Sequence, residues 1–250
     1  MNVKNIKSFI EFYKFLGITD CVLQYPRIQL TSGLKIKSTS DLNRASKENR
    51  KKIRSMIQKL DGLKSEIKEL DCNLKEIATN LVFSDGNHKS KIMILGEAPG
   101  ANEDIEGKPF VGDAGKLLDK MLNYIGLNRK NFYISNIVFW RPPGNRTPNE
   151  KEISTCLPMT KKHIRLIKPR LLIFVGSIAA KSLLSSKDGI TKLRGKEHFY
   201  IDDEINLKIP ARAIFHPAYL FRNPIEKKRT WEDLLEIDEH IKKEGILKNE

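Results

Sequence analysis

The sequence predicts an α/β fold: a three-layer α/β/α sandwich with a central, mainly parallel four-stranded sheet, plus an N-terminal helical extension. Short apolar runs rich in branched residues recur in the later part of the chain, as expected of strands that are buried on both faces. Segments with helical spacing alternate with these runs, which is the order of a parallel sheet covered by helices on both sides. A charge-dense stretch with a different pattern precedes them all.

Residues 1–70 are expected to form the helical extension. Apolar residues recur at three-and-four spacing over residues 3–16, which predicts one face of an amphipathic helix. Residues 22–40 lack a sustained period and contain proline and glycine, so we expect a linker there. From about Asp41 to Glu69, apolar positions spaced for a long helix lie among charged residues.

The second region, residues 71–245, carries the strand and helix signals of the sandwich. Each strand is expected at a short, predominantly apolar run, and each helix where apolar residues share one face. The predicted strands are Ile92–Leu95, Phe132–Phe139, Leu171–Val175 and Ala211–Phe215. The predicted helices are Lys116–Ile125, Asn149–Ile167 and Glu226–Lys242, with a further one starting at Gly176.

The composition indicates a polyanionic partner and no membrane span. The formal net charge is +14 and the pI is near 9.6, and nucleic acid is the commonest partner of so basic a chain. No apolar run is long enough to cross a bilayer, and charged residues interrupt the N-terminus too early for a signal peptide, so we expect a cytoplasmic protein. The three cysteines are widely spaced and odd in number, which argues against a disulfide framework.

Chemistry-bearing residues follow three of the predicted strands. Glu97 lies in a tight glycine- and proline-bounded loop after the first strand, Asn136 lies within the second, and His216 follows the fourth. Open parallel sheets place their ligands at the carboxyl ends of the strands. Phe110 is an aromatic residue on an otherwise polar loop. Each fragment alone also fits an ordinary role, such as a strand-to-helix turn, a core plug or an amide bonded to local backbone.

Three stretches in this order closely resemble the family 4 uracil-DNA glycosylases, within the uracil-DNA glycosylase superfamily. They are GEAPGANED at 96–104, NIVFWRPPGNRTP at 136–148 and HPAYLFRNP at 216–224. The resemblance covers about Cys72 to Glu236, and it makes residues 71–245 a catalytic domain. It implies a monofunctional DNA glycosylase without lyase activity. Such an enzyme flips uracil out of DNA, hydrolyses its N-glycosidic bond and leaves an abasic site for base excision repair.

The resemblance also implies roles for the residues of the pocket. Glu97 would orient water and stabilise the positive charge that grows on the sugar, with Asp104 or Glu103 as a supporting acid. His216 would lie beside uracil O2 and stabilise the departing anion. Phe110 would stack on the base, and the Asn136 amide suits the O4 and N3–H edge of uracil. The remaining implied uracil contacts are Gly96 and Ala98.

The HPAYLFR stretch resembles the family's DNA-inserting loop. Tyr219 or Leu220 would wedge into the vacated base stack, while Arg222 meets phosphate; the alternative for both wedge candidates is core contact. Arg146 and Pro217 complete the implied DNA contacts. The expected partner is uracil-containing DNA, single- or double-stranded, and we expect a monomer.

Members of the family commonly hold a 4Fe-4S cluster with four cysteines. Here Cys72 and Cys156 match two of the four positions, while Glu69 and Trp140 occupy the other two. Two thiolates cannot complete a Cys₄ site, so we expect no cofactor and packing around Trp140 in its place. No His-x-x-x-His or Cys-x-x-Cys pattern is present, so no catalytic metal is expected either.

Two other functions would each account for part of the sequence. A catalytically weak DNA-binding module, linked to replication or repair, would account for the charge but has no need of Glu97, Phe110, Asn136 and His216 together. The related branch that traps uracil-DNA covalently uses a histidine in the loop after the second strand. That loop here reads RPPGNRTPNEKE and contains none.

Overall fold

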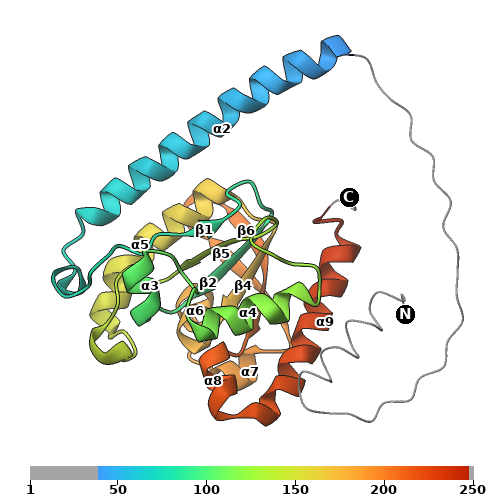
Figure 1. Ribbon diagram of the computed structural model, residues 1–250. Helices are drawn as coiled ribbons and strands as arrows, with labels where there is room; N and C mark the ends of the chain where they lie inside the picture. Colours follow the sequence, from blue (N-terminus) through green and yellow to red (C-terminus); the bar gives the residue numbers. More distant parts are fainter. Residues whose placement is uncertain (1–38, 248–250) are drawn as a thin grey trace, which may run out of the picture. The chain divides into compact units, whose positions relative to one another are not determined.

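The computed structural model describes residues 39–247, with side chains described from residue 53 (Figure 1). The chain divides into two units, Met1–Gly62 and Leu63–Glu250. The helix expected over residues 3–16 and nearly all of the expected linker lie outside the described residues. The predicted long helix is present as α2, Thr39–Lys68.

A six-stranded sheet forms the centre of the second unit, in the order β1-β3-β2-β4-β6-β5. The four inner strands are parallel and correspond to the four predicted strands: β2 (Ile92–Gly96), β3 (Tyr133–Asn136), β4 (Leu171–Val175) and β6 (Leu207–Ile214). Two antiparallel edge strands were not predicted: β1 (Asp85–Gly86) and β5 (Glu197–Asp202). The predicted four-stranded sheet is therefore the parallel core of a larger mixed sheet.

Helices cover both faces of this sheet. The longer ones are α4 (Asp113–Asn123), α5 (Glu150–Ile167), α6 (Ser177–Leu184) and α9 (Lys227–Lys243). Right-handed crossovers between parallel strands put α4 on one face and α5 and α6 on the other. Helix α9 contacts both α4 and β6, so it lies on the same face of the sheet as α4 (Figure 1). The described region from β1 to α9 thus has the three layers that the alternating pattern predicts.

Short helices connect these elements near the ends of the strands. They are α3 (Ala101–Glu106), α7 (Ile190–Leu193) and α8 (Pro217–Arg222), with 3₁₀ turns at Asn73–Glu76, Pro143–Asn145, Asp203–Ile205 and Pro224–Glu226. Helix α3 follows β2 and α8 follows β6, so both begin at the carboxyl edge of the sheet. That edge is where an open parallel sheet leaves room for a ligand.

Strand β3 ends at Asn136, three residues before its predicted end. Beyond it, the amides of Ile137 and Val138 donate to the carbonyls of Gly96 and Glu97, at 2.9 and 3.0 Å. Gly96 is itself paired with Asn136 in the sheet register. The backbones that follow β2 and β3 therefore stay together, and they hold Glu97 and Asn136 at one edge.

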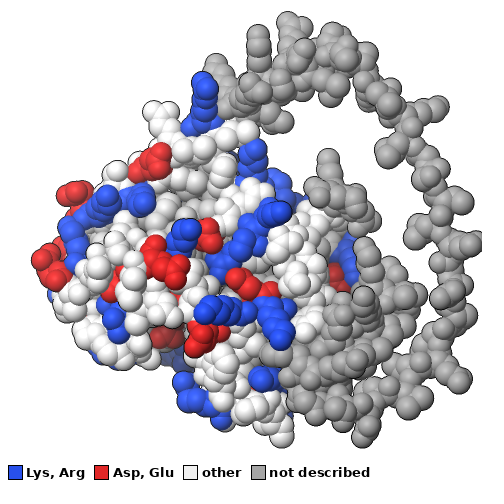
Figure 2. Space-filling view, in the orientation of Figure 1, with Lys and Arg blue, Asp and Glu red and all other residues white. Residues whose placement is uncertain are grey.

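The surface charge does not form a single basic patch on the face in view. In Figure 2, lysine and arginine side chains lie among acidic ones. Within the described residues, no helix has the length and hydropathy that a membrane crossing requires.

Candidate active site

A pocket of roughly 480 Å³ opens at the carboxyl ends of β2, β3 and β6. Its walls come from the loops after these three strands and from the start of α4. Most of the predicted site residues line it: Glu97, Ala98, Phe110, Asn136, Arg146, His216, Tyr219 and Arg222. The convergence that the sequence predicted from strand ends is therefore present in the structure. Gly96, Asp104, Pro217 and Leu220 are not among the lining residues of this pocket in the described chain.

Asn136 presents a buried amide to the pocket. Its side chain is 1% exposed, and among the described residues its Oδ1 has no hydrogen-bond partner. A buried acceptor without a partner costs on the order of 1–3 kcal/mol, so folding alone does not explain an amide at this position. A ligand that donates to Oδ1 would recover this cost.

Phe110 lies against the end of β2 because Gly96 has no side chain. A Cβ on Gly96 would lie 2.3 Å from the Phe110 ring and 2.5 Å from Asn136 Oδ1. The Phe110 ring lies 6.0 Å from that of His216, centroid to centroid, with the planes tilted by 31°. Gly96 therefore acts beneath the pocket by giving space to two of the residues that line it.

Glu97 is half-buried at the pocket, and the pKa of its carboxyl is raised. Burial raises the pKa of the carboxyl, while a hydrogen bond with the Thr147 side chain lowers it. Thr147 was not predicted as a site residue, although it lies in the RPPGNRTP loop next to Arg146. Its hydroxyl is the one signal in the sequence that could have identified it.

His216 is neutral and presents one particular tautomer. Its Nδ1 accepts a hydrogen bond from the Ala218 amide at 3.2 Å, so the ring proton is on Nε2. Burial lowers the pKa of His216 to about 4; Glu103 acts against this and Arg222 reinforces it. A neutral imidazole with its N–H on Nε2 is a hydrogen-bond donor that does not need to be charged.

Asp104 and Glu103, the two predicted supporting acids on α3, lie in different surroundings. Asp104 is 3% exposed, and its Oδ1 accepts from the amides of Thr79 and Asn80, both at 2.9 Å. Asp104 therefore anchors the chain before β1, and its predicted catalytic role is corrected. Glu103 lines the pocket, where its carboxylate accepts from three backbone amides: those of Gly100, Val111 and Gly112.

The predicted DNA contacts also include both buried and exposed residues. Leu220 is 0% exposed, so its predicted insertion into DNA is corrected, and the alternative of core contact holds. Tyr219 is half-buried and stacks on Phe215 at 5.0 Å, while Arg222 is exposed at the pocket rim. The exposed apolar residues next to them are Phe221, at 54%, and Ile225, at 84%.

Arg146 lines the pocket, but its guanidinium is engaged within the protein. Nη1 and Nη2 donate to the two carboxylate oxygens of Glu152 at 2.9 and 2.7 Å, and Nη1 also donates to the Thr147 carbonyl. Glu152 is 1% exposed and also accepts from the Asn149 amide. This ion pair fixes the loop that carries Thr147 next to Glu97.

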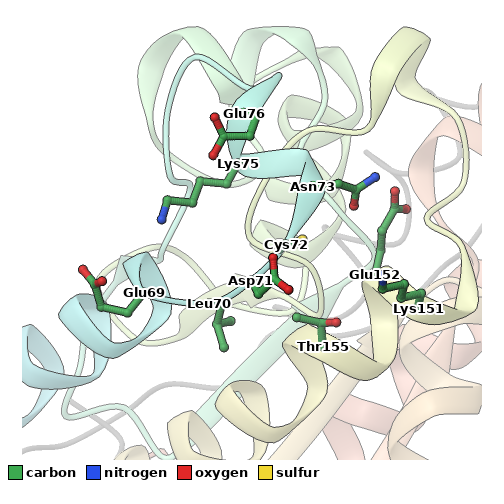
Figure 3. A pocket seen from close by; sticks show the side chains of 10 residues that line it. All are labelled: Glu69, Leu70, Asp71, Cys72, Asn73, Lys75, Glu76, Lys151, Glu152 and Thr155. Atoms are coloured by element: carbon green, nitrogen blue, oxygen red, sulfur yellow. The ribbon is translucent and has the colours of Figure 1, made fainter.

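A second hollow, of roughly 370 Å³, is lined in part by Cys72, one of the two cysteines expected at cluster positions (Figure 3). Cys72 and Glu69 line it from the end of α2 and the turn that follows, and Glu152 lines it from α5. The thiols of Cys72 and Cys156 are hydrogen-bonded to one another, and burial raises the pKa of Cys156 to about 12. Trp140 is 3% exposed and packs edge-on against Phe139.

These residues do not fit a Cys₄ cluster. The described chain offers two thiols there, and no three of its His, Cys, Asp and Glu side chains come together as metal ligands. Glu69 is exposed and Trp140 has no ligand atom. The absence of a cluster stays a prediction.

Comparisons with known proteins agree with this geometry. The family described as "Uracil DNA glycosylase superfamily" matches residues 83–235. The type-4 uracil-DNA glycosylase of Saccharolobus solfataricus is 40% identical over 193 residues, which cover 75% of this chain and 88% of that protein. The type-4 enzymes of Sulfurisphaera tokodaii and Archaeoglobus fulgidus are 40% and 36% identical, over 72% and 73% of this chain and 84% and 94% of their own lengths. From this family match and these relatives we conclude that the chain belongs to the type-4 uracil-DNA glycosylases.

Proposed function

We propose that the pocket at the carboxyl ends of β2, β3 and β6 binds a uracil flipped out of DNA and that its residues hydrolyse the N-glycosidic bond. Uracil excision for DNA repair is the activity of this family, and the enzyme is a hydrolytic, monofunctional DNA glycosylase. The observation that carries the assignment to this pocket is the buried, unpaired Oδ1 of Asn136 beside Glu97, Phe110 and His216.

Asn136 selects the base by hydrogen bonding. Oδ1 accepts from uracil N3–H, and the amide nitrogen donates to O4. Cytosine presents an acceptor at N3 and a donor at position 4. In the same orientation, Oδ1 would oppose an acceptor and the amide nitrogen would oppose a donor. A site built for one hydrogen-bonding pattern rejects the other strongly, because its buried polar groups are then left without partners.

Glu97 and His216 act on the two ends of the breaking bond. As the bond between C1′ and N1 lengthens, its electron pair moves onto the base and positive charge grows on the sugar. The Glu97 carboxylate stabilises this charge and orients the water whose oxygen bonds to C1′. His216 donates from Nε2 to uracil O2, where negative charge develops. The products are free uracil and an abasic site.

The experiment that tests this function is excision from an oligonucleotide with a single uracil, followed by alkaline cleavage. The wild-type protein is compared with Glu97→Ala, and a thymine strand serves as the substrate control. We expect uracil-specific strand breaks that fall by about 100-fold or more in the variant. Salt-sensitive DNA binding without excision by the wild type would instead favour the DNA-binding module.

The substrate is DNA that contains uracil. We infer that both single and double strands are accepted, that the protein is monomeric and that it works in the cytoplasm. Matched single- and double-stranded substrates test the first inference, and light scattering tests the second. The iron content and visible absorbance of freshly purified protein test the expected absence of a cluster.

A further inference from the structure

Phe110 has a backbone conformation that is unfavourable for its residue type. Its φ is +57°, in the left-handed region that bulky side chains rarely adopt. Such a residue costs on the order of 1–3 kcal/mol and persists when the surrounding structure enforces it. Gly115 makes room for this conformation, because a Cβ there would lie 1.9 Å from the Phe110 carbonyl oxygen.

Arg129 holds this backbone from the side away from the pocket. Its Nη2 donates to the carbonyl oxygen of Phe110 at 2.7 Å, and its Nη1 donates to that of Pro109 at 3.1 Å. The residue comes from the turn between α4 and β3 and is absent from the pocket lining. Two consecutive carbonyls at the strained residue are therefore fixed by one planar group.

The guanidinium is itself held in place by two carboxylates. Nε lies 3.0 Å from Asp119 Oδ1, and Nη1 lies 3.1 Å from Asp85 Oδ2. The side chain is 24% exposed, so these contacts are partly shielded from solvent. An arginine can make all of these contacts because its donors form a rigid planar fork, which the single ammonium of a lysine lacks.

The amides that follow Phe110 are held from the pocket side. Glu103 Oε1 accepts from Val111 and Gly112, at 2.8 Å each. The strained residue thus lies between one cationic and one anionic anchor. Loss of either anchor leaves the left-handed conformation with less support.

We infer that Arg129 is a positioning residue for uracil binding: it acts through Phe110 by holding the stacking ring against the end of β2 before the base arrives. This inference rests on the proposed function of the pocket. Preorganisation of this kind contributes to affinity because the ordering cost is met on folding rather than on binding.

Two arginines make a matched comparison. Arg165 is also partly buried, at 22%, and binds Asp202 through two hydrogen bonds of 2.6 and 2.7 Å. It lies on α5 and is absent from the lining of the pocket among the described residues. Arg129→Lys and Arg165→Lys should therefore both lower the melting temperature, while Arg129→Lys alone should weaken the binding of free uracil.

The first measurement is inhibition of excision by free uracil, together with direct calorimetric binding. We expect Arg129→Lys to raise the uracil inhibition constant by about tenfold, because base stacking contributes roughly 1–3 kcal/mol. In a Phe110→Ala background the same change should have little further effect, since the two residues act as one unit. An unchanged constant in Arg129→Lys, or the same factor in both backgrounds, would overturn the inference.

The second measurement does not depend on activity. A crystal structure of Arg129→Lys should show Phe110 released from the left-handed region or with a mobile ring. A Phe110 that keeps its conformation and order would contradict the proposed role. If the wild type releases no uracil, the proposed function fails. If the wild type excises uracil but Arg129→Lys and Arg165→Lys bind free uracil equally well, only the inference about Arg129 fails.

Discussion

The pocket at Glu97 and the hollow at Cys72 are similar in size but differ in how their polar groups are paired. In the pocket, Asn136 Oδ1 is without a partner among the described residues, and burial raises the pKa of Glu97. In the hollow, Glu152 is tied to Arg146, which lowers the pKa of its carboxyl. Volume alone would not separate the two sites. The buried acceptor of the pocket is therefore open to a ligand, whereas the buried carboxylate of the hollow is occupied by its ion pair.

Asn136→Leu gives the largest expected separation of activity from stability. Leucine is similar in size to asparagine but cannot pair with uracil, so excision should fall by about 100-fold or more. The melting temperature should stay the same or rise, because an unpaired buried amide is replaced by an apolar group. Excision kinetics and thermal denaturation check both parts. A marked loss of stability would show that the amide serves the fold.

Glu152→Gln should show the opposite pattern. Glutamine can still accept from the Asn149 amide at the start of α5, but the ion pair with Arg146 is lost. We expect the free energy of unfolding to fall by about 1–2 kcal/mol, with a smaller change in excision. Chemical denaturation measures this. Glu204→Gln is the control, because Glu204 also binds an arginine but is 75% exposed, and exposed pairs contribute little.

Because Leu220 is buried, Tyr219 stays the predicted wedge, and Ile225→Ala and Phe221→Ala test whether an exposed apolar neighbour fills the base stack instead. An exposed apolar side chain that wedges into duplex DNA stabilises the flipped state. Each change should slow excision from double-stranded DNA by up to about tenfold and leave single-stranded DNA unaffected, since the latter has no paired stack to fill. Ile201→Ala on β5, at 58% exposure, is the control. Equal slowing on both substrates would contradict a wedge.

The parallel core of the sheet could be predicted because its central strands, β2 and β4, are apolar and buried at every position. Strand β5 could not, since an edge strand is buried on one side only and here exposes Glu197, Phe199 and Ile201. Its alternation is short and includes charges, as a loop does. The two-residue strand β1 is too short to have any period.

Part of the pocket could be predicted because Glu97, Asn136 and His216 lie at or just after the ends of inner strands. The residues that the structure buries away from the pocket lie on short helices: Asp104 next to Glu103, and Leu220 next to Tyr219. Consecutive helical residues point about 100° apart, and a six-residue helix has too few apolar positions to show which side faces the core. The hydrogen bonds of Arg129 join loops distant in sequence, and nothing in the local sequence indicates them.

Thr147→Val tests the smallest expected effect, on the pH dependence of excision. In the proposed mechanism excision requires the Glu97 carboxylate, so we expect activity to fall as the pH drops through the pKa of Glu97. Burial raises this pKa and the Thr147 hydrogen bond lowers it, so removal of the hydroxyl should move the acidic limb to higher pH. His216, with a pKa of about 4, stays neutral above that value and does not set the limb. Single-turnover rates across acidic and neutral pH measure the shift, and Thr147→Ser should restore it. Thr155→Val, in the hollow at Cys72, is the matched control. An acidic limb that moves equally in both variants would show that the shift does not come from the hydrogen bond between Thr147 and Glu97.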